Sequence, residues 1–218
     1  MTDTTNNKQT VHETPEEIEY ELRGQIGSIW SGGRLFIGMY TFLLASVAFS
    51  YFYLRAANNG LLWRPHNVTA PTTYGWTIWS LSLVTAVLVL VGQRRLRSGN
   101  VLDWQVAGWA GVACGLGALI AQVYEFTDVP FYPGSSGYAS TFIGWSVINI
   151  ITLAGATYWL ETTLARAYRM RKESGEASPE LSNAATARLF RANVSSMSYF
   201  WGFVALSGAL FLAMFYLL

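Results

Sequence analysis

Gln122 and Glu125 are the polar pair in this sequence best placed to do chemistry within an apolar segment. They are three positions apart, so on a helix they share one face and the Gln122 amide can donate a hydrogen bond to the Glu125 carboxylate. A partly buried carboxylate is costly unless it is paired or protonated. We expect the pair to stabilise the end of its helix. Two simpler alternatives are that Glu125 faces the outer water, or that it caps the loop that begins at Phe126.

Metal and haem chemistry needs ligands that the apolar segments lack. Imidazole is the usual ligand for haem, copper and zinc, and both histidines, His12 and His66, lie outside these segments. The one cysteine, Cys114, sits among Gly and Ala, so no disulfide or CxxC motif is available. We expect no metal, haem or catalytic residue in this chain.

Two other membrane chemistries find little support. Intramembrane proteolysis needs a Ser with a His, or two Asp, within the bilayer, but Asp103 and Asp128 flank opposite ends of one segment. A transporter would be expected to show broken helices or midplane charges, whereas Glu125 lies near the outer end of its segment and Glu161 near the cytoplasmic end of another. A structural or lipid-related role remains for Glu125.

The elements that must position these residues are membrane helices. Hydrophobic residues make up 52% of the chain and charged residues 12%, about half the charge expected of a soluble domain. A helix needs about 20 apolar residues to cross a bilayer. Residues 31–218 therefore predict an all-α integral membrane bundle of five transmembrane helices, at about 35–54, 74–92, 104–124, 139–162 and 197–218.

The basic residues predict the orientation of the bundle. Twelve of the fourteen Lys and Arg residues fall before the first span or in the loops on that side, and only Arg55 and Arg64 fall on the other. The positive-inside rule then predicts a cytoplasmic N-terminus and a periplasmic C-terminus. Because the first thirty residues are polar and acidic, with no signal-peptide pattern, we expect a bacterial inner (cytoplasmic) membrane.

Residues 1–30 predict an acidic cytoplasmic segment, either a short amphipathic helix or a flexible tail. Thr14, followed by Pro15 and Glu17, is typical of a helix start.

In the inner loop, 166–196, a break at 175–179 followed by a short surface helix is predicted. The third span is rich in glycine, which favours close helix packing; its glycines are Gly108, Gly111, Gly115 and Gly117.

Three segments carry a resemblance to a known family. The first span ends in SYFYLR (50–55), the stretch 122–142 reads QVYEFTDVPFYPGSSGYASTF, and the last span contains FWGFV (200–204). These resemble, in the same order, segments of subunit III of cytochrome c oxidase and related haem-copper oxygen reductases, in its short five-helix bacterial form. The shared positions of the middle segment are Gln122, Glu125, Phe126, Asp128, Pro130, Phe131, Gly137, Tyr138, Ser140, Thr141 and Phe142.

The chain departs from the family at five positions within its spans where the family has ionisable residues. The family's intramembrane Glu falls at Tyr40, and its two fourth-span His residues fall at Asn149 and Thr152. Its last-span His and Asp fall at Gly202 and Ala205. Family roles that depend on those ionisable groups are therefore not expected here.

The resemblance implies an accessory, non-catalytic subunit of a terminal oxidase. It implies packing beside the catalytic subunit I, haem and copper in partner subunits only, bound phospholipid, support of stability and proton uptake, and no nucleic-acid partner. A quinol oxidase subunit III, the subunit-III-like partner of nitric oxide reductase, and a free-standing transporter or scaffold are the alternatives. The candidate structural or lipid-contact residues are Tyr40, Arg55, Gln122, Glu125, Asn149 and Thr152.

Overall fold

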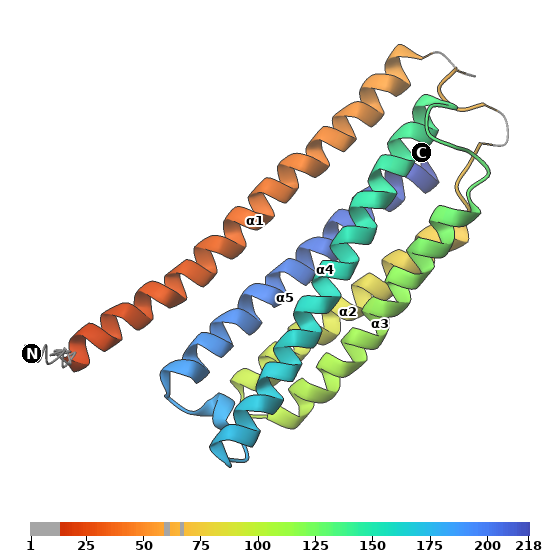
Figure 1. Ribbon diagram of the computed structural model, residues 1–218. Coiled ribbons are helices and arrows are strands. Elements are labelled where there is room, and N and C mark those ends of the chain that lie inside the picture. Colours follow the sequence, from red (N-terminus) through yellow and green to blue (C-terminus); the bar gives the residue numbers. More distant parts are fainter. Residues whose placement is uncertain (1–13, 59–61, 66–67) are drawn as a thin grey trace, which may run out of the picture.

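The computed structural model describes residues 14–58, 62–65 and 68–218, and these form an all-helical protein without strands (Figure 1). Residues 1–13, which include His12, and His66 lie outside the described part. A 3₁₀ turn and a π turn, η2 and η3, flank the last helix. The elements are α1 Pro15–Ala57, α2 Thr72–Arg97, α3 Val101–Asp128, α4 Gly137–Ser174, η2 Pro179–Leu181, α5 Ala185–Leu212 and η3 Ala213–Leu217.

Five of these helices are long and apolar enough to cross a membrane, so the predicted number of spans and the all-α class are confirmed. The helices extend beyond the predicted spans. α1 has 43 residues, which at 1.5 Å per residue gives a length of about 64 Å, roughly twice the hydrocarbon thickness of a bilayer. Which end of the bundle faces the cytoplasm stays a prediction.

The described part of the acidic segment is continuous with the first span. Thr14 caps α1, because its Oγ1 accepts a 3.3 Å hydrogen bond from Glu17 N and its N–H donates a 2.7 Å bond to Glu17 Oε2. The predicted helix start is confirmed. From Pro15 onward the acidic segment is a helix, as the first of the two predicted alternatives has it, and not a tail. This helix continues into the first span, since nothing between Pro15 and Leu35 interrupts it.

The loop between α4 and α5 is shorter than the sequence suggested. Gly175 ends α4 in the left-handed conformation, with a φ of 69°, so the predicted break is confirmed. The surface helix predicted after it is wrong, because those residues are the first turns of α5. The fully buried residues Ala187, Phe190 and Val194 recur at helical spacing and lead directly into the last span.

Helices α2 to α5 form a four-helix bundle, and α1 lies to one side of it (Figure 1). α1 packs mainly against α5 and α4. Only three of its described residues, Leu22, Leu44 and Tyr51, are buried. Most of its apolar surface therefore faces outward, which in a bilayer means lipid or another protein.

Glycines allow α3 and α4 to approach each other closely. A Cβ placed on Gly108 would lie 2.7 Å from Leu164 Cδ2, and one on Gly115 would lie 2.7 Å from Thr157 Oγ1. Both distances are shorter than van der Waals contact, so a larger residue would push the helices apart. The packing role predicted for the glycines of the third span is confirmed at these two positions.

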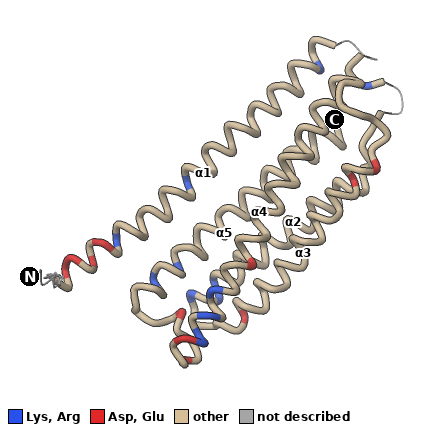
Figure 2. Tube along the Cα trace, viewed as in Figure 1, with Lys and Arg blue, Asp and Glu red and all other residues tan. Residues whose placement is uncertain are grey.

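Most charged residues lie at one end of the bundle, where α2 and α4 end and α3 and α5 begin (Figure 2). Two arginines lie toward the opposite end: Arg55 in the last turn of α1, and Arg64 over the ring of Tyr138 at the start of α4. The apolar lengths of the helices between the two ends carry few charges (Figure 2). This distribution is the one on which the predicted orientation depends.

Candidate functional site: a buried polar cluster

Gln122 and Glu125 lie side by side within the helix bundle, on the last two turns of α3. Gln122 Nε2 donates a 2.7 Å hydrogen bond to Glu125 Oε2. The Glu125 side chain is fully buried and Gln122 is 1% exposed. The expected hydrogen bond is confirmed, and the alternative that Glu125 faces water does not hold.

Asn149 on α4 extends this pair. Its Nδ2 donates a 2.6 Å hydrogen bond to Gln122 Oε1, and its side chain is 8% exposed. The Gln122 amide thus accepts from α4 and donates to Glu125, which fixes the orientation of the amide group. The sequence named all three residues as candidates but did not indicate that Asn149 would contact Gln122.

Tyr216 completes the cluster from the last turn of the chain. Its hydroxyl donates a 2.6 Å hydrogen bond to Glu125 Oε1. Its ring lies against Gly75 of α2, where an added Cβ would come within 2.8 Å of the ring carbons. Because Tyr216 belongs to the π turn η3, it joins the C-terminal turn to α2 and α3 together.

The surroundings of Glu125 favour a structural role over proton conduction. Among the described residues, no Lys or Arg pairs with Glu125, so its two neutral donors are the groups that offset its desolvation. The cavity beside Gln122, Asn149 and Tyr216 has a volume of about 20 Å³, which is room for about one water molecule. On the α4 side, the series of hydrogen bonds from Glu125 ends in the side-chain amides of Gln122 and Asn149. Amides carry no titratable proton.

Tyr40 and Thr152 form a second polar contact, between α1 and α4. Their hydroxyl groups are hydrogen-bonded to each other, and Thr152 also donates a 2.7 Å bond to the Ile148 carbonyl. Tyr40 packs edge-on against Phe203 of α5. These two candidates therefore connect the outlying helix α1 to the bundle.

Arg55 is not brought to the polar cluster. It is exposed at the end of α1, where its Nη1 donates a 3.3 Å hydrogen bond to the Tyr51 hydroxyl. Its guanidinium lies 5.9 Å from the Tyr51 ring centroid. Arg55 is thus a local contact of the helix end.

An aromatic cluster surrounds the polar one at the same end of the bundle. Tyr138 is fully buried; its hydroxyl accepts a 3.2 Å bond from Ala70 N and donates a 2.8 Å bond to the Phe215 carbonyl. Phe131 and Phe142 pack edge to face 5.5 Å apart. The loop after α3, the start of α4 and the π turn η3 are joined by these contacts.

The charged end of the bundle has an ion pair that holds the start of α1. Arg188 Nη1 and Nη2 lie 2.6 and 3.0 Å from the two Glu19 carboxylate oxygens, and Arg23 Nε lies 3.1 Å from Glu19. Glu19 precedes the apolar part of α1. Hydrogen bonds from Arg188 and Arg23 lower the pKa of the Glu19 carboxyl from its ordinary value of 4.5 to about 2.

Cys114 is half-buried and unpaired on α3. In the described part of the chain, no three His, Cys, Asp or Glu side chains come together as a metal site would require.

Neither models of known protein families nor characterised proteins match this sequence.

Sequence reasoning missed Tyr216 and Tyr138, and it missed the ion pair of Glu19 with Arg188. Tyr138 was named in the family-like segment, but nothing in its spacing indicated a partner 77 residues away. Nothing in the sequence indicated that Tyr216 would contact Glu125. The π turn sets where the Tyr216 side chain points, and the sequence does not show that turn.

Proposed function

We propose that this chain is an accessory, cofactor-free membrane subunit of the subunit III type, part of a respiratory terminal oxidase that reduces oxygen and translocates protons. It packs beside a catalytic subunit that carries haem and copper. Its own part is to hold lipid and to support the stability and proton uptake of the complex. The membrane is the inner membrane of a bacterium.

The observation that supports the proposal most directly is that residues of the family-like segment, 122–142, contact one another in the buried interior of the bundle. Gln122 and Glu125 bond to each other, and Phe131, Tyr138 and Phe142 pack in one buried aromatic cluster. Residues shared with the subunit III family therefore serve to fix one end of a helix bundle. This is the use expected of a scaffold subunit rather than of a catalytic one.

The exposed apolar surface of α1 also supports a role in an assembly. Phe42 is 75% exposed and Met39 74% exposed on α1, and α1 has few contacts with its own bundle. Such a helix can pack against another membrane subunit through its aromatic and aliphatic side chains. The identity of that subunit is the point to test.

The decisive experiment is to purify the full-length chain with an affinity tag from its own membranes in a mild detergent. We expect a haem-copper catalytic subunit to co-purify, with haem absorbance and copper in constant ratio to the tagged chain. A preparation from the untagged strain is the control. A homogeneous chain without partners would contradict the proposal and favour a free-standing transporter or scaffold.

The chain by itself is expected to carry no haem or copper. Expressed without the other subunits, it should be colourless and copper-free by elemental analysis. Stoichiometric haem or copper in that preparation would contradict a cofactor-free role. The same co-purification distinguishes the variants of the proposal, because a quinol oxidase, a cytochrome c oxidase and a nitric oxide reductase differ in their partner chains and haem spectra.

A further inference from the structure

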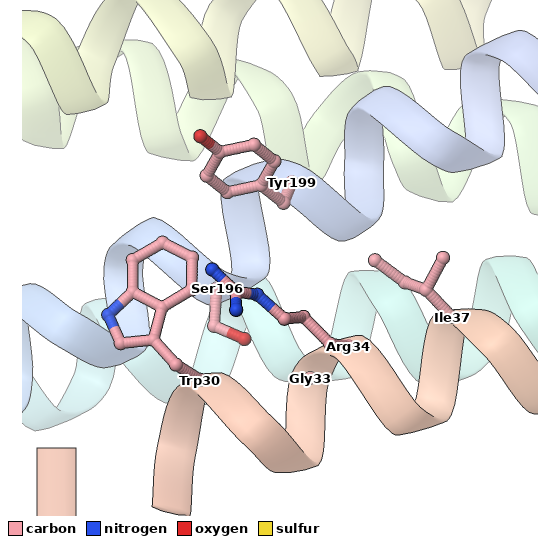
Figure 3. A pocket seen from close by; sticks show the side chains of 6 residues that line it. All are labelled: Trp30, Gly33, Arg34, Ile37, Ser196 and Tyr199. Atoms are coloured by element: carbon pink, nitrogen blue, oxygen red, sulfur yellow. The ribbon is translucent and has the colours of Figure 1, made fainter. Parts of the chain in front are cut away.

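At its charged end, α1 meets α5 next to a cavity of about 440 Å³ (Figure 3). A Cβ at Gly33 would overlap Ser196 Oγ, so the two helices are in close contact there. Arg34 extends from α1 toward Trp30 and the Tyr199 side of α5 (Figure 3), and its guanidinium carbon lies 5.9 Å from the Trp30 ring centroid. A cationic group thus points into a cavity bounded by aromatic rings.

A second cavity, of about 280 Å³, shares Trp30 with the first and brings in two more arginines, Arg97 and Arg191. Arg97 is held by Ser195, whose Oγ accepts bonds of 3.1 Å from Arg97 Nη2 and 2.8 Å from Gln93 Nε2. The charge at this end of α2 is thereby placed beside the start of α5.

Arg191 is fixed in a different way from Arg97. Its Nη1 donates to the carbonyl oxygens of Glu180 and Ser182, at 2.7 and 2.9 Å. Backbone carbonyls orient a guanidinium but do not neutralise its charge. Among the described residues, neither cavity has a carboxylate in its lining, so three positive charges surround this space without a negative one.

Next to the charged cavities, the groove between α1 and α5 becomes apolar. A third cavity, of about 590 Å³, begins one turn further along both helices. On α1 it runs from Thr41 to Ala48, and on α5 from Phe203 to Leu210. Arg34 and Ala45 are eleven positions apart on α1, a distance of about 16 Å along the helix. This is close to the depth of one leaflet of the bilayer core, about 15 Å.

We propose that these cavities form a binding site for one anionic phospholipid, with its phosphate at Arg34 and Arg97 beside Trp30 and an acyl chain in the groove between α1 and α5. Arginine matches a phosphate group in both charge and geometry. Trp30 lines both charged cavities and comes just before the apolar stretch of α1 that begins at Leu35. Trp is typical of the interface between headgroups and hydrocarbon in membrane proteins. The charge of the site favours a headgroup with net negative charge over a zwitterionic one.

The proposal requires only that the chain lies in a membrane. It is independent of the proposed association with an oxidase, and the test below uses the chain alone. The site specifies the lipid-holding part of the proposed function and rests on it. A missing partner subunit would contradict the proposed association without bearing on this site, and equal binding of the two lipids would contradict this site without bearing on the association.

The full-length chain, purified in a neutral detergent, is titrated with phosphatidylglycerol or phosphatidylcholine, and the lipid adducts are counted by native mass spectrometry. We expect one phosphatidylglycerol to bind at least about tenfold more tightly than phosphatidylcholine. Since each arginine near a membrane surface contributes about fivefold to the affinity for anionic lipid, Arg34→Gln combined with Arg97→Gln should remove this preference. Arg94→Gln, on the same end of α2 but outside both cavities, should preserve it.

Equal affinity for the two lipids, or an equal loss in the Arg94→Gln variant, would overturn the proposal and indicate a general attraction to positive charge. Circular dichroism and gel filtration confirm that each variant is folded. If the double variant fails to fold, the single variants Arg34→Gln and Arg97→Gln carry the test, each with an expected loss of about fivefold.

The acyl-chain half of the site is tested separately. Ala45→Trp fills the apolar groove and should weaken binding of phosphatidylglycerol at least about tenfold, whereas Leu43→Trp, on the same helix but outside the groove lining, should not. Glycerol phosphate, which has the phosphate without the chains, should bind far more weakly than the lipid. Equal binding of glycerol phosphate, or no effect of Ala45→Trp, would contradict a lipid occupant.

Discussion

Tyr216 and Glu125, 91 residues apart in the sequence, are joined by a hydrogen bond of 2.6 Å between the phenol hydroxyl and the carboxylate. The bond connects the last turn of the chain to the end of α3 in a place where Glu125 is fully buried. Because a buried carboxylate is costly without donors, the C-terminal turn helps to stabilise the candidate site.

We expect Tyr216→Phe to destabilise the protein by about 1 to 3 kcal/mol, since it removes one of the two donors to a buried carboxylate while preserving the ring. The measurement is thermal unfolding of the purified chain in detergent. The matched control is Tyr158→Phe, because Tyr158 is 68% exposed on α4 and should tolerate the change. Equal stability of the two variants would show that the hydrogen bond to Glu125 contributes little.

The ion pair between Glu19 and Arg188 should fasten the first turns of α1 to α5. We expect Arg188→Gln to speed hydrogen exchange in residues before about 30, while leaving the global unfolding temperature nearly unchanged, because both groups are near the surface. Arg169→Gln, an exposed change on α4, is the control. Unchanged exchange in the Arg188→Gln variant would contradict this role.

The pH dependence of that contact follows from the lowered pKa of Glu19. A carboxyl whose pKa falls on folding contributes stability that is fully present above its unfolded value, here 4.5, and is lost as the pH falls through the folded value of about 2. The difference in exchange between the native chain and Arg188→Gln should therefore be constant between pH 5 and 8. A change within that range would require another titrating group.

The all-helical class and the number of spans were predictable, because apolar runs of about 20 residues can satisfy their backbone groups in a bilayer only as helices. The Gln122–Glu125 bond was predictable for a local reason, since the two residues are one turn apart on one helix. The helix start at Thr14 was predictable for the same reason, because its capping partner Glu17 is only three residues away.

Contacts between distant segments were not predictable from spacing. The bond from Asn149 to Gln122 depends on how α4 is rotated against α3, and that rotation is set by packing at residues such as Gly108 and Leu164. The merging of the predicted surface helix into α5 was missed for a related reason. Residues 185–196 have both charged and apolar positions, and only contact with the bundle decides which face is buried.

The orientation of the bundle can be tested with reporter fusions. We expect a reporter fused after Arg97 to be active on the cytoplasmic side and one fused after Leu218 to be active on the periplasmic side, because twelve of fourteen basic residues precede the first span or lie in the loops on its side. A phosphatase active only outside the cytoplasm and a fluorescent protein active only inside provide opposite readouts. Both reporters on one side would contradict the arrangement of five spans.

Substitution of Glu125 separates a structural role from a proton-conducting one. Glu125→Gln keeps the shape of the side chain and an acceptor for Tyr216, but deletes the group that exchanges protons. In the complex that we propose, this variant should leave oxygen reduction and proton pumping nearly intact. Glu125→Leu should loosen the subunit from the complex, because it leaves the buried Gln122 amide and the Tyr216 hydroxyl without their acceptor, at a cost of about 1 to 3 kcal/mol for each.

The readouts are the yield of assembled complex, the rate of oxygen uptake and the number of protons pumped per electron in reconstituted vesicles. Phe126→Leu is a suitable control, because it changes a neighbouring, 36% exposed side chain without touching the hydrogen bonds of the cluster. If Glu125→Gln abolished pumping while the complex stayed assembled, the carboxyl itself would have to exchange protons during turnover. The cluster of Asn149, Gln122, Glu125 and Tyr216 would then be part of a proton pathway rather than a fastening at the end of α3.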